Sequence, residues 1–232
     1  MISPFRRCIA IVATVAVCLG GAAVAGAAPV SFSTVPVSGW STNGPVRAVL
    51  IVGDTVYAGG DFTQVRGPGG SPVVNRARLA AWDIRTGALR TGFAADANGR
   101  VSALASDGSR LFVGGDFTSI KGVSRSRLAA VDPVSGNVNT AWSANATAIV
   151  YGLRVAGTRL YAAGAFKKVG ASTRNGIAAV ATANGAVDAT FNPNANAAVH
   201  AVTTSPDGAT VYLAGDFTTG GTSSRQIGRA HV

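Results

Sequence analysis

The chain has 232 residues, of which 47% are apolar and 13% charged, so we expect a packed core rather than intrinsic disorder. Its formal net charge of +10 could attract nucleic acid, but the arginines are spread along the chain and form no cluster or arm. We therefore expect no nucleic-acid partner. All the acidic residues are aspartate, and alanine, glycine and valine dominate, which is typical of a GC-rich coding sequence and favours a bacterial source.

Residues 1–27 have the pattern of a secretory signal peptide. Arg6 and Arg7 form its charged start, Cys8 to Leu19 form the apolar stretch, and Ala25-Gly26-Ala27 fits a small-residue cleavage site. The apolar stretch is too short for a good transmembrane helix. We expect cleavage after Ala27 and a secreted protein that is extracellular or associated with the cell surface, without stable membrane insertion.

Both cysteines, Cys8 and Cys18, fall inside this leader. A lipoprotein anchor at Cys18 is an alternative, but Val17 stands where a small residue is normally required. The mature segment then has no thiol, which excludes disulfides, a cysteine nucleophile and cysteine metal ligands.

Three motifs repeat along the chain. The first is Gly59-Gly60-Asp61-Phe62, which returns as Gly114-Gly115-Asp116-Phe117, Ala163-Gly164-Ala165-Phe166 and Ala214-Gly215-Asp216-Phe217. The second is Arg78-Leu79-Ala80-Ala81, which returns at intervals of 49 residues from Arg127 and from Gly176. The third is an aromatic residue, again at intervals of 49 residues, at Phe93, Trp142 and Phe191. A fixed period of this size is the signature of a repeat architecture.

Each unit contains four short strand signals. In the second unit they cover 101–105, 111–117 and 128–132, with a fourth that ends near Trp142. Asp107-Gly108 and Ser135-Gly136 supply the turns of two hairpins, because glycine tolerates the positive φ that such turns need. No segment shows sustained helical periodicity.

A four-stranded unit of about 49 residues has the size of a propeller blade. We predict an all-β chain, a β-propeller of four-stranded blades with about three and a half blades present and the ring incomplete. A sandwich or a β-solenoid is the alternative. The partial propeller spans 28–226, with repeats at roughly 41–93, 94–142, 143–191 and 192–226. Residues 30–40 resemble the fourth strand of an incomplete blade.

The repeat register ends at Arg225, which aligns with Arg76, Arg125 and Arg174. The codons of Ile227 to Val232 can match a common sequencing-library adapter. We therefore predict that residues 227–232 are adapter read-through and that the natural protein continues as a larger one.

The four phenylalanine-centred motifs, the Leu-Ala-Ala and Ile-Ala-Ala strands and the turn Phe191-Asn192-Pro193-Asn194 resemble the delta-60 repeat family of bacterial secreted β-propellers. The resemblance covers residues 40–225. The third unit departs from it, with Ala165 for the aspartate and Gly176 for the arginine, and the first unit carries a six-residue insertion around Arg66 to Pro72. The resemblance implies a secreted, often multidomain protein joined to adhesion or carbohydrate-associated modules, and no defined activity.

The repeated polar residues are predicted to serve the blades. Paired catalytic carboxylates need environments that separate their pKa values, whereas these residues occupy equivalent positions. We expect the aspartates to cap turns or to pair with arginines across two strands. The predicted structural blade residues are Asp61, Phe62, Asp116, Phe117, Phe166, Asp216, Phe217, Arg76, Arg125 and Arg174.

Few residues break the repeat in a way that suggests binding. His200 replaces Ser102 and Tyr151 in a first strand, where a side chain can face the central channel. The insertion that begins at Arg66 is not needed by any blade, and loops that depart from a scaffold often carry function. His200 and Arg66 are therefore the candidate binding residues.

Other candidate sites have simpler interpretations. The alternating Asn192, Asn194 and Asn196 could be calcium ligands, but the EF-hand pattern is missing and an asparagine-rich turn is simpler. Aromatic side chains could stack on sugars, but their repeat-locked positions favour packing between blades; these are Trp40, Phe93, Trp142 and Phe191.

No nucleophile elbow, phosphate loop or dinucleotide fingerprint occurs in the sequence. We therefore predict no catalytic residues, no metal and no cofactor. The expected function is a non-enzymatic binding or interaction scaffold for an unknown protein or carbohydrate ligand. Two alternatives stay open. One is a glycan-active or quinone-dependent propeller enzyme whose active site is largely outside this fragment, and the other is a surface-structural or adhesion role.

Overall fold

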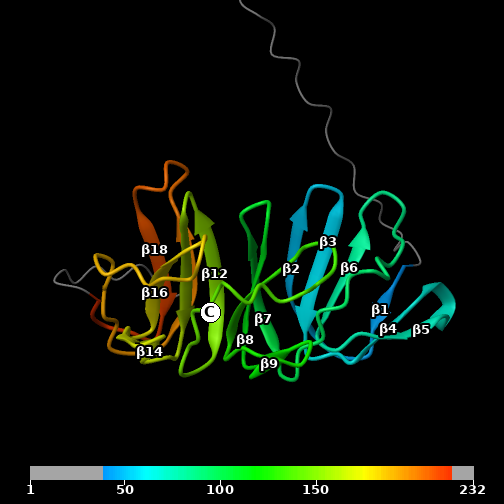
Figure 1. Cartoon of the computed structure of the whole chain (residues 1–232), viewed down its shortest axis with the longest axis horizontal. Helices are drawn as coiled ribbons and strands as arrows, with labels where there is room; N and C mark the ends of the chain where they lie inside the picture. Colours follow the sequence, from blue (N-terminus) through cyan, green and yellow to red (C-terminus); the bar gives the residue numbers. More distant parts are fainter. Residues whose placement is uncertain (1–38, 221–232) are drawn as a thin grey trace, which may run out of the picture. The chain divides into compact units, whose positions relative to one another are not determined.

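A computed structural model describes residues 39–220 of the chain (Figure 1). These residues form antiparallel strands joined by turns, with one short 3-10 helix. The elements are β1 (Ser41–Thr42), β2 (Val46–Val52), β3 (Thr55–Gly60), β4 (Gln64–Arg66), η1 (Pro68–Gly70), β5 (Val73–Asn75), β6 (Leu79–Asp83), β7 (Val101–Ser106), β8 (Leu111–Gly115), β9 (Ser119–Ile120), β10 (Val123–Ser124), β11 (Leu128–Val131), β12 (Val150–Ala156), β13 (Arg159–Gly164), β14 (Lys168–Val169), β15 (Ser172–Thr173), β16 (Ile177–Ala181), β17 (Val199–Thr204) and β18 (Val211–Gly215).

Each repeat has one main sheet, and this sheet is a propeller blade. Blade one is β2-β3-β6, blade two is β7-β8-β11, blade three is β12-β13-β16, and blade four is β17-β18 within the described residues. The register is the same in each, since the first residue of the first strand pairs with the second glycine of the repeated motif, as in Val101 with Gly115. The predicted all-β propeller is confirmed.

The predicted fourth strand is shorter than expected. After the turn at Gly136, Val138 forms an isolated bridge to Val131, and the amide of Asn139 donates to the carbonyl of Ala130. Blades one and three have the same bridge, between Trp82 and Leu89 and between Val180 and Val187. The segment must leave the sheet at once to reach the next blade, so it forms a bridge and not a ladder.

A small outer hairpin lies between the second and third strands of each complete blade, where the sequence predicted only a loop. These hairpins are β4–β5, β9–β10 and β14–β15. The insertion after Arg66 lengthens the first of them and forms η1, and most of its residues are exposed. The insertion therefore extends an existing hairpin.

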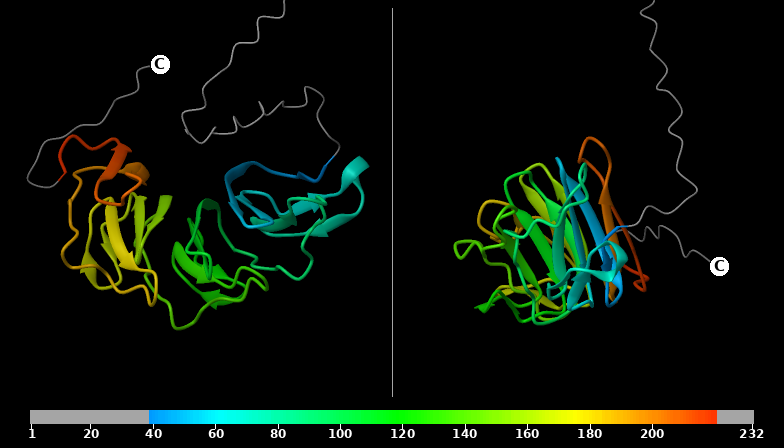
Figure 2. Two further views of the ribbon diagram at one scale, coloured as in Figure 1. Left: turned by 90° about the horizontal axis from the view of Figure 1, so that it is seen from above. Right: turned by 90° about the vertical axis from the view of Figure 1, so that its right-hand side faces the viewer.

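Neighbouring blades pack through their first strands, since β2 contacts β7, β7 contacts β12 and β12 contacts β17. Figure 2 shows the sheets following one another in chain order, from blue to red. The ring is not closed among the described residues. Val46 is 43% exposed, whereas its equivalents Val101, Val150 and Val199 are buried by the preceding blade.

The second glycine of the repeated motif is required by a close approach of the backbone. A Cβ atom built on Gly115 would lie 2.0 Å from the carbonyl oxygen of Arg100, the residue before the first strand. Gly60, Gly164 and Gly215 have the same contact, at 2.1 to 2.2 Å. Any side chain there would push the first and second strands apart.

The repeated aromatic residues fill the space between blades. Phe93 packs against Tyr57, Trp142 against Phe112, and Phe191 against Tyr161, with ring centroids 5.3, 5.5 and 5.1 Å apart. Trp40 packs beside Phe62 in a small cluster on the open side of blade one. These side chains therefore belong to the core, as their repeat-locked positions indicated.

The turn between the third and fourth segments is held by an aspartate. In blade two the Asp132 carboxylate accepts hydrogen bonds from the amide and hydroxyl of Ser135, both at 2.7 Å, and from the amide of Val134 at 3.1 Å. The hydrogen bond from the Ser135 amide, together with that from its hydroxyl, holds the pKa of Asp132 below its ordinary value.

We expect Asp132→Asn to flatten the acid side of the stability profile. A carboxyl whose pKa is lowered in the folded state contributes stability above its ordinary pKa of about 4 and loses it as the pH falls through the folded pKa. Thermal melts from about pH 7 to about pH 3 should show the variant less stable at neutral pH, with the two curves converging in acid. A difference in melting temperature that is independent of pH would contradict this role.

Several sequence predictions lie outside the described residues. They are the signal peptide at 1–27, most of the incomplete-blade strand at 30–40, the end of the repeat register at Arg225, and the read-through segment 227–232. Within 39–220, no helix has the length and apolar character needed to cross a bilayer.

Candidate ligand-binding site

Every first strand contains a β-bulge at its second residue. The pairing register shifts between Val46 and Ala48 in blade one, and at the equivalent point in the other three blades. A bulge turns a side chain away from the regular alternation of the strand and is over-represented beside functional sites. The bulged residues, which we call the bulge row, are Arg47, Ser102, Tyr151 and His200.

The bulge row differs in chemistry from blade to blade, whereas its flanking residues repeat. Each bulged residue follows a valine, and each first strand pairs with a second strand that ends in glycine. The row therefore places one arginine, one serine, one tyrosine and one histidine on a constant backbone, at the end of the sheets where the repeated aspartates also lie.

Asp61 joins two arginines from neighbouring blades. Its carboxylate oxygens lie 2.6 Å from Nε of Arg47 and 2.9 Å from Nε of Arg100. Partial burial acts to raise the pKa of Asp61, but the hydrogen bonds from Arg100 and Arg47 outweigh it and leave that pKa below its ordinary value. The group is ionised at neutral pH and orients both guanidinium groups.

His200 forms the other polar cluster of the bulge row. Its Nε2 lies 2.9 Å from a carboxylate oxygen of Asp216, and its ring centroid is 5.0 Å from that of Tyr151. The side chains of His200 and Asp216 are 49% and 68% exposed, so a ligand can reach them. His200 was predicted from sequence as a binding candidate, and the structure places it in the bulge row.

The predicted blade arginines Arg76, Arg125 and Arg174 bind backbone carbonyls. Arg76 donates to the carbonyl of Thr91, Arg125 to that of Thr140 and Arg174 to that of Asp188, at 2.9 to 3.0 Å. These carbonyls lie near the start of the connection to the next blade. Each of these three arginines is therefore occupied with the chain that leaves its own blade, and the arginines that pair with the repeated aspartates are others.

The repeated aspartates have different partners in different blades. Asp61 binds Arg47 and Arg100, Asp216 binds His200, and Asp116 lies 3.5 Å from Nε of Arg127. The repeated phenylalanines, in contrast, all pack in apolar surroundings. Phe62, Phe117 and Phe166 are at most 1% exposed, and Phe217 is partly buried in the cluster between blades three and four.

Arg66 and the asparagine-rich turn are not part of the bulge row. Arg66 is exposed at the end of β4, where its backbone pairs with Ser41 of β1. Asn196 accepts hydrogen bonds from the amides of Thr218 and Thr219, so its carboxamide holds a turn. In the described part of the chain, no three histidine, cysteine, aspartate or glutamate side chains gather as metal ligands would.

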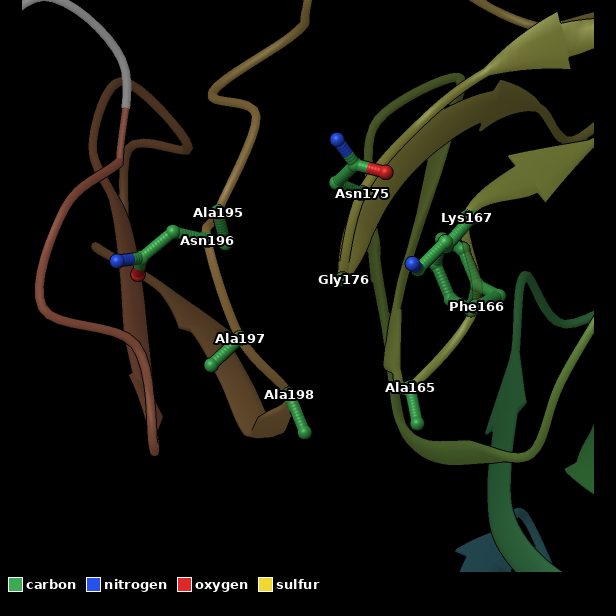
Figure 3. Close-up of a pocket in the computed structure, with 9 residues that line it drawn as sticks. All are labelled: Ala165, Phe166, Lys167, Asn175, Gly176, Ala195, Asn196, Ala197 and Ala198. Carbon is green, nitrogen blue, oxygen red and sulfur yellow. The ribbon is translucent and has the colours of Figure 1, made fainter.

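A pocket of about 440 Å³ lies between blades three and four (Figure 3). Its wall on blade three consists of Ala165 to Lys167 and Asn175 to Gly176, and the segment Ala195 to Ala198 that leads into β17 forms the opposite wall. Figure 3 shows the side chains of Lys167 and Asn175 beside the opening. No acidic residue is among these lining residues.

Sequence reasoning missed most of the residues of these two sites. Arg47 and Arg100 were not singled out, although Arg47 stands at the repeat position of His200. Ala165 and Gly176 were recognised as departures from the repeat. The sequence did not show that they line a pocket beside Lys167, because this follows only from the packing of blade three on blade four. The sequence signal for the pocket was that one unit lacks both the repeated aspartate and the repeated arginine.

Residues 105–140 match a family described as a β-propeller domain of unknown function (DUF5122). The match runs from the end of β7 to the segment after β11, so it covers most of blade two. None of the curated proteins compared with the chain matches it.

Solved structures similar to the chain include two computationally designed proteins and one natural domain. Ika4 is 14% identical with a TM-score of 0.48, over 75% of this chain and 92% of that one. Ika8 is 15% identical with a TM-score of 0.46, over 72% of this chain and 45% of that one. The WD40 β-propeller domain of Doa1 is 13% identical with a TM-score of 0.49, over 78% of this chain and 49% of that one. The chain thus spans less than half the length of the last two.

Proposed function

We propose that this β-propeller chain is an exported, non-enzymatic binding scaffold whose bulge row contacts a carbohydrate or protein ligand. One observation carries the proposal: at the bulge of each first strand the residue type changes from blade to blade, while the surrounding residues repeat. A constant frame that presents a set of different side chains is the arrangement expected of a recognition surface.

The chemistry of the bulge row suits a polar ligand. Arginine and aspartate side chains offer charge-assisted hydrogen bonds, and Arg47 and Arg100 are already oriented by Asp61. Tyr151 and His200, whose ring centroids lie 5.0 Å apart, supply aromatic faces in the same row. Sugars combine hydroxyl groups with apolar ring faces, so a polysaccharide is the partner we would test first.

We also propose that the chain belongs to the delta-60 repeat family of bacterial secreted β-propellers. The Gly-Gly-x-Phe motifs support membership of the delta-60 repeat propellers, and the leader at 1–27 supports secretion from a bacterium.

Binding to a panel of soluble polysaccharides, measured by affinity gel electrophoresis, tests the function. We expect one of hydroxyethyl cellulose, xylan, alginate or polygalacturonate to retard the chain. The triple variant Arg47→Ala, Tyr151→Ala and His200→Ala should bind it at least about tenfold more weakly, because truncation removes side chains that contact the ligand.

Arg85→Ala is the matched control. Arg85 is an exposed arginine paired with Asp54 in the turn between β2 and β3, at the other end of the sheet, so its loss should leave affinity unchanged. Equal weakening by the control and the triple variant would point to a general charge effect and contradict the proposal. Shortening of the polymer chains would favour the glycan-active enzyme, and failure to bind any of the four would exclude them as ligands of the row.

A further inference from the structure

The pocket between blades three and four occupies a space that an arginine fills in the earlier blades. In blade one, Arg78 donates from Nη1 to the carbonyl of Ala97 at 3.0 Å, and in blade two Arg127 donates to the carbonyl of Ala146 at 3.3 Å. Both arginines therefore cross the space between their own blade and the connection to the next one.

Blade three has glycine at this position with the same backbone. The φ angles of Arg78, Arg127 and Gly176 are 68°, 65° and 70°, so the backbone conformation is kept although the side chain is lost. Ala165 also replaces the aspartate that lies 3.5 Å from Arg127 in blade two. The two members of one ion pair are thus absent together, and the space is open to a ligand.

The same blade adds a positive charge to the opening. Lys167 stands where the other blades have Thr63, Thr118 and Thr218. The carboxamide of Asn175, whose Nδ2 donates to Asn194 at 2.6 Å, lines the same wall. The carbonyl of Ala195 is the equivalent of those that accept from Arg78 and Arg127, and it lies on the opposite wall.

We infer that this pocket binds a carboxylate-bearing sugar of the uronic acid type. An ammonium group with no lining carboxylate selects an anion, while the Asn175 amide and the backbone carbonyls suit hydroxyl groups. A volume of about 440 Å³ lies within the range of small-molecule sites. The pocket does not include the bulge row, so this inference stands apart from the ligand proposed there.

D-glucuronate is the probe for the test, with D-glucose and acetate as comparison ligands that each lack half of the recognised chemistry. Binding is measured by titration of the purified chain, followed by NMR chemical shifts. We expect saturable, millimolar binding of glucuronate, and binding of glucose and acetate that is about tenfold weaker.

Three variants place in blade three the residues that the other blades carry at the same positions. Lys167→Thr and Ala165→Asp should each weaken glucuronate binding about tenfold, by removing the ammonium or by adding a like charge. Gly176→Arg should abolish binding by filling the pocket. Its Cβ would lie 2.9 Å from the carbonyl oxygen of Ala197, so a failure of this variant to fold leaves the first two to decide.

Lys168→Thr is the control, because Lys168 is an exposed lysine next in sequence that does not line the pocket. It should bind glucuronate as the unchanged chain does, and so should the triple variant of the bulge row. No saturable binding of glucuronate, or equal weakening by Lys167→Thr and Lys168→Thr, would overturn the inference. Glucose binding as tight as glucuronate binding would do so as well.

Discussion

Replacing Gly115 by alanine is expected to lower the free energy of unfolding by about 3 kcal/mol, at the upper end of what overpacking a close-packed site costs. The added Cβ would meet the carbonyl oxygen of Arg100 at 2.0 Å. That carbonyl accepts the amide hydrogen of Asp116 at 2.8 Å, so moving it away also weakens a backbone hydrogen bond. Urea unfolding followed by tryptophan fluorescence measures the change.

Gly92→Ala is the matched control for this substitution. Gly92 is exposed, and a Cβ built on it has no neighbouring atom within 4 Å. Its replacement should change stability by less than about 0.5 kcal/mol. If both alanine variants unfolded at the same urea concentration as the unchanged chain, the close approach would not be what fixes glycine in the repeated motif.

Trp142→Ala should cost about 4 kcal/mol, because it leaves a large cavity between blades two and three. Trp142 is fully buried, packs against Phe112, and donates from its indole nitrogen to the carbonyl of Ala181 at 3.2 Å. The last contact joins the connection out of blade two to the third strand of blade three. Both the packing and the hydrogen bond are lost in the alanine variant.

Two further variants separate these contributions. Trp142→Phe places the residue of the other repeats, Phe93 and Phe191, at this position, and should cost only about 1 to 2 kcal/mol through the lost hydrogen bond and the smaller ring. Tyr212→Ala truncates the blade-four equivalent of Phe112, which is 39% exposed, and should cost clearly less than Phe112→Ala. Equal costs for Phe112 and Tyr212 would show that packing between blades is not the source of the stability.

The blade architecture was predictable because each unit repeats the same local requirements. The glycine motifs, the apolar third strand and the aromatic residue every 49 residues mark where strands meet and where blades touch. The small outer hairpins were not predictable in the same way. Pairs such as β9–β10 have two residues on each side, too few to show a period.

The candidate sites were less predictable because they depend on exceptions to the repeat. His200 was found because histidine is rare in this chain, whereas Arg47 is one arginine among many. The bulges that contain Arg47 and His200 are visible only in the strand pairing. In blade one, Val46 pairs with Gly60 and Ala48 with Gly59, so Arg47 has no partner in the register. Likewise, the partners of Asp61 come from two blades, and Arg100 is 39 positions away in the sequence.

The open pocket also affects how blades three and four are held together. Blade four packs on blade three through β17, which contacts β12 and β13. In an array of repeated units each contact is local, so the stability of one junction depends on the groups that lie in it. A molecule bound between Lys167 and Ala195 would touch both sides of this junction and stabilise it, so its concentration would set how often the two blades separate there.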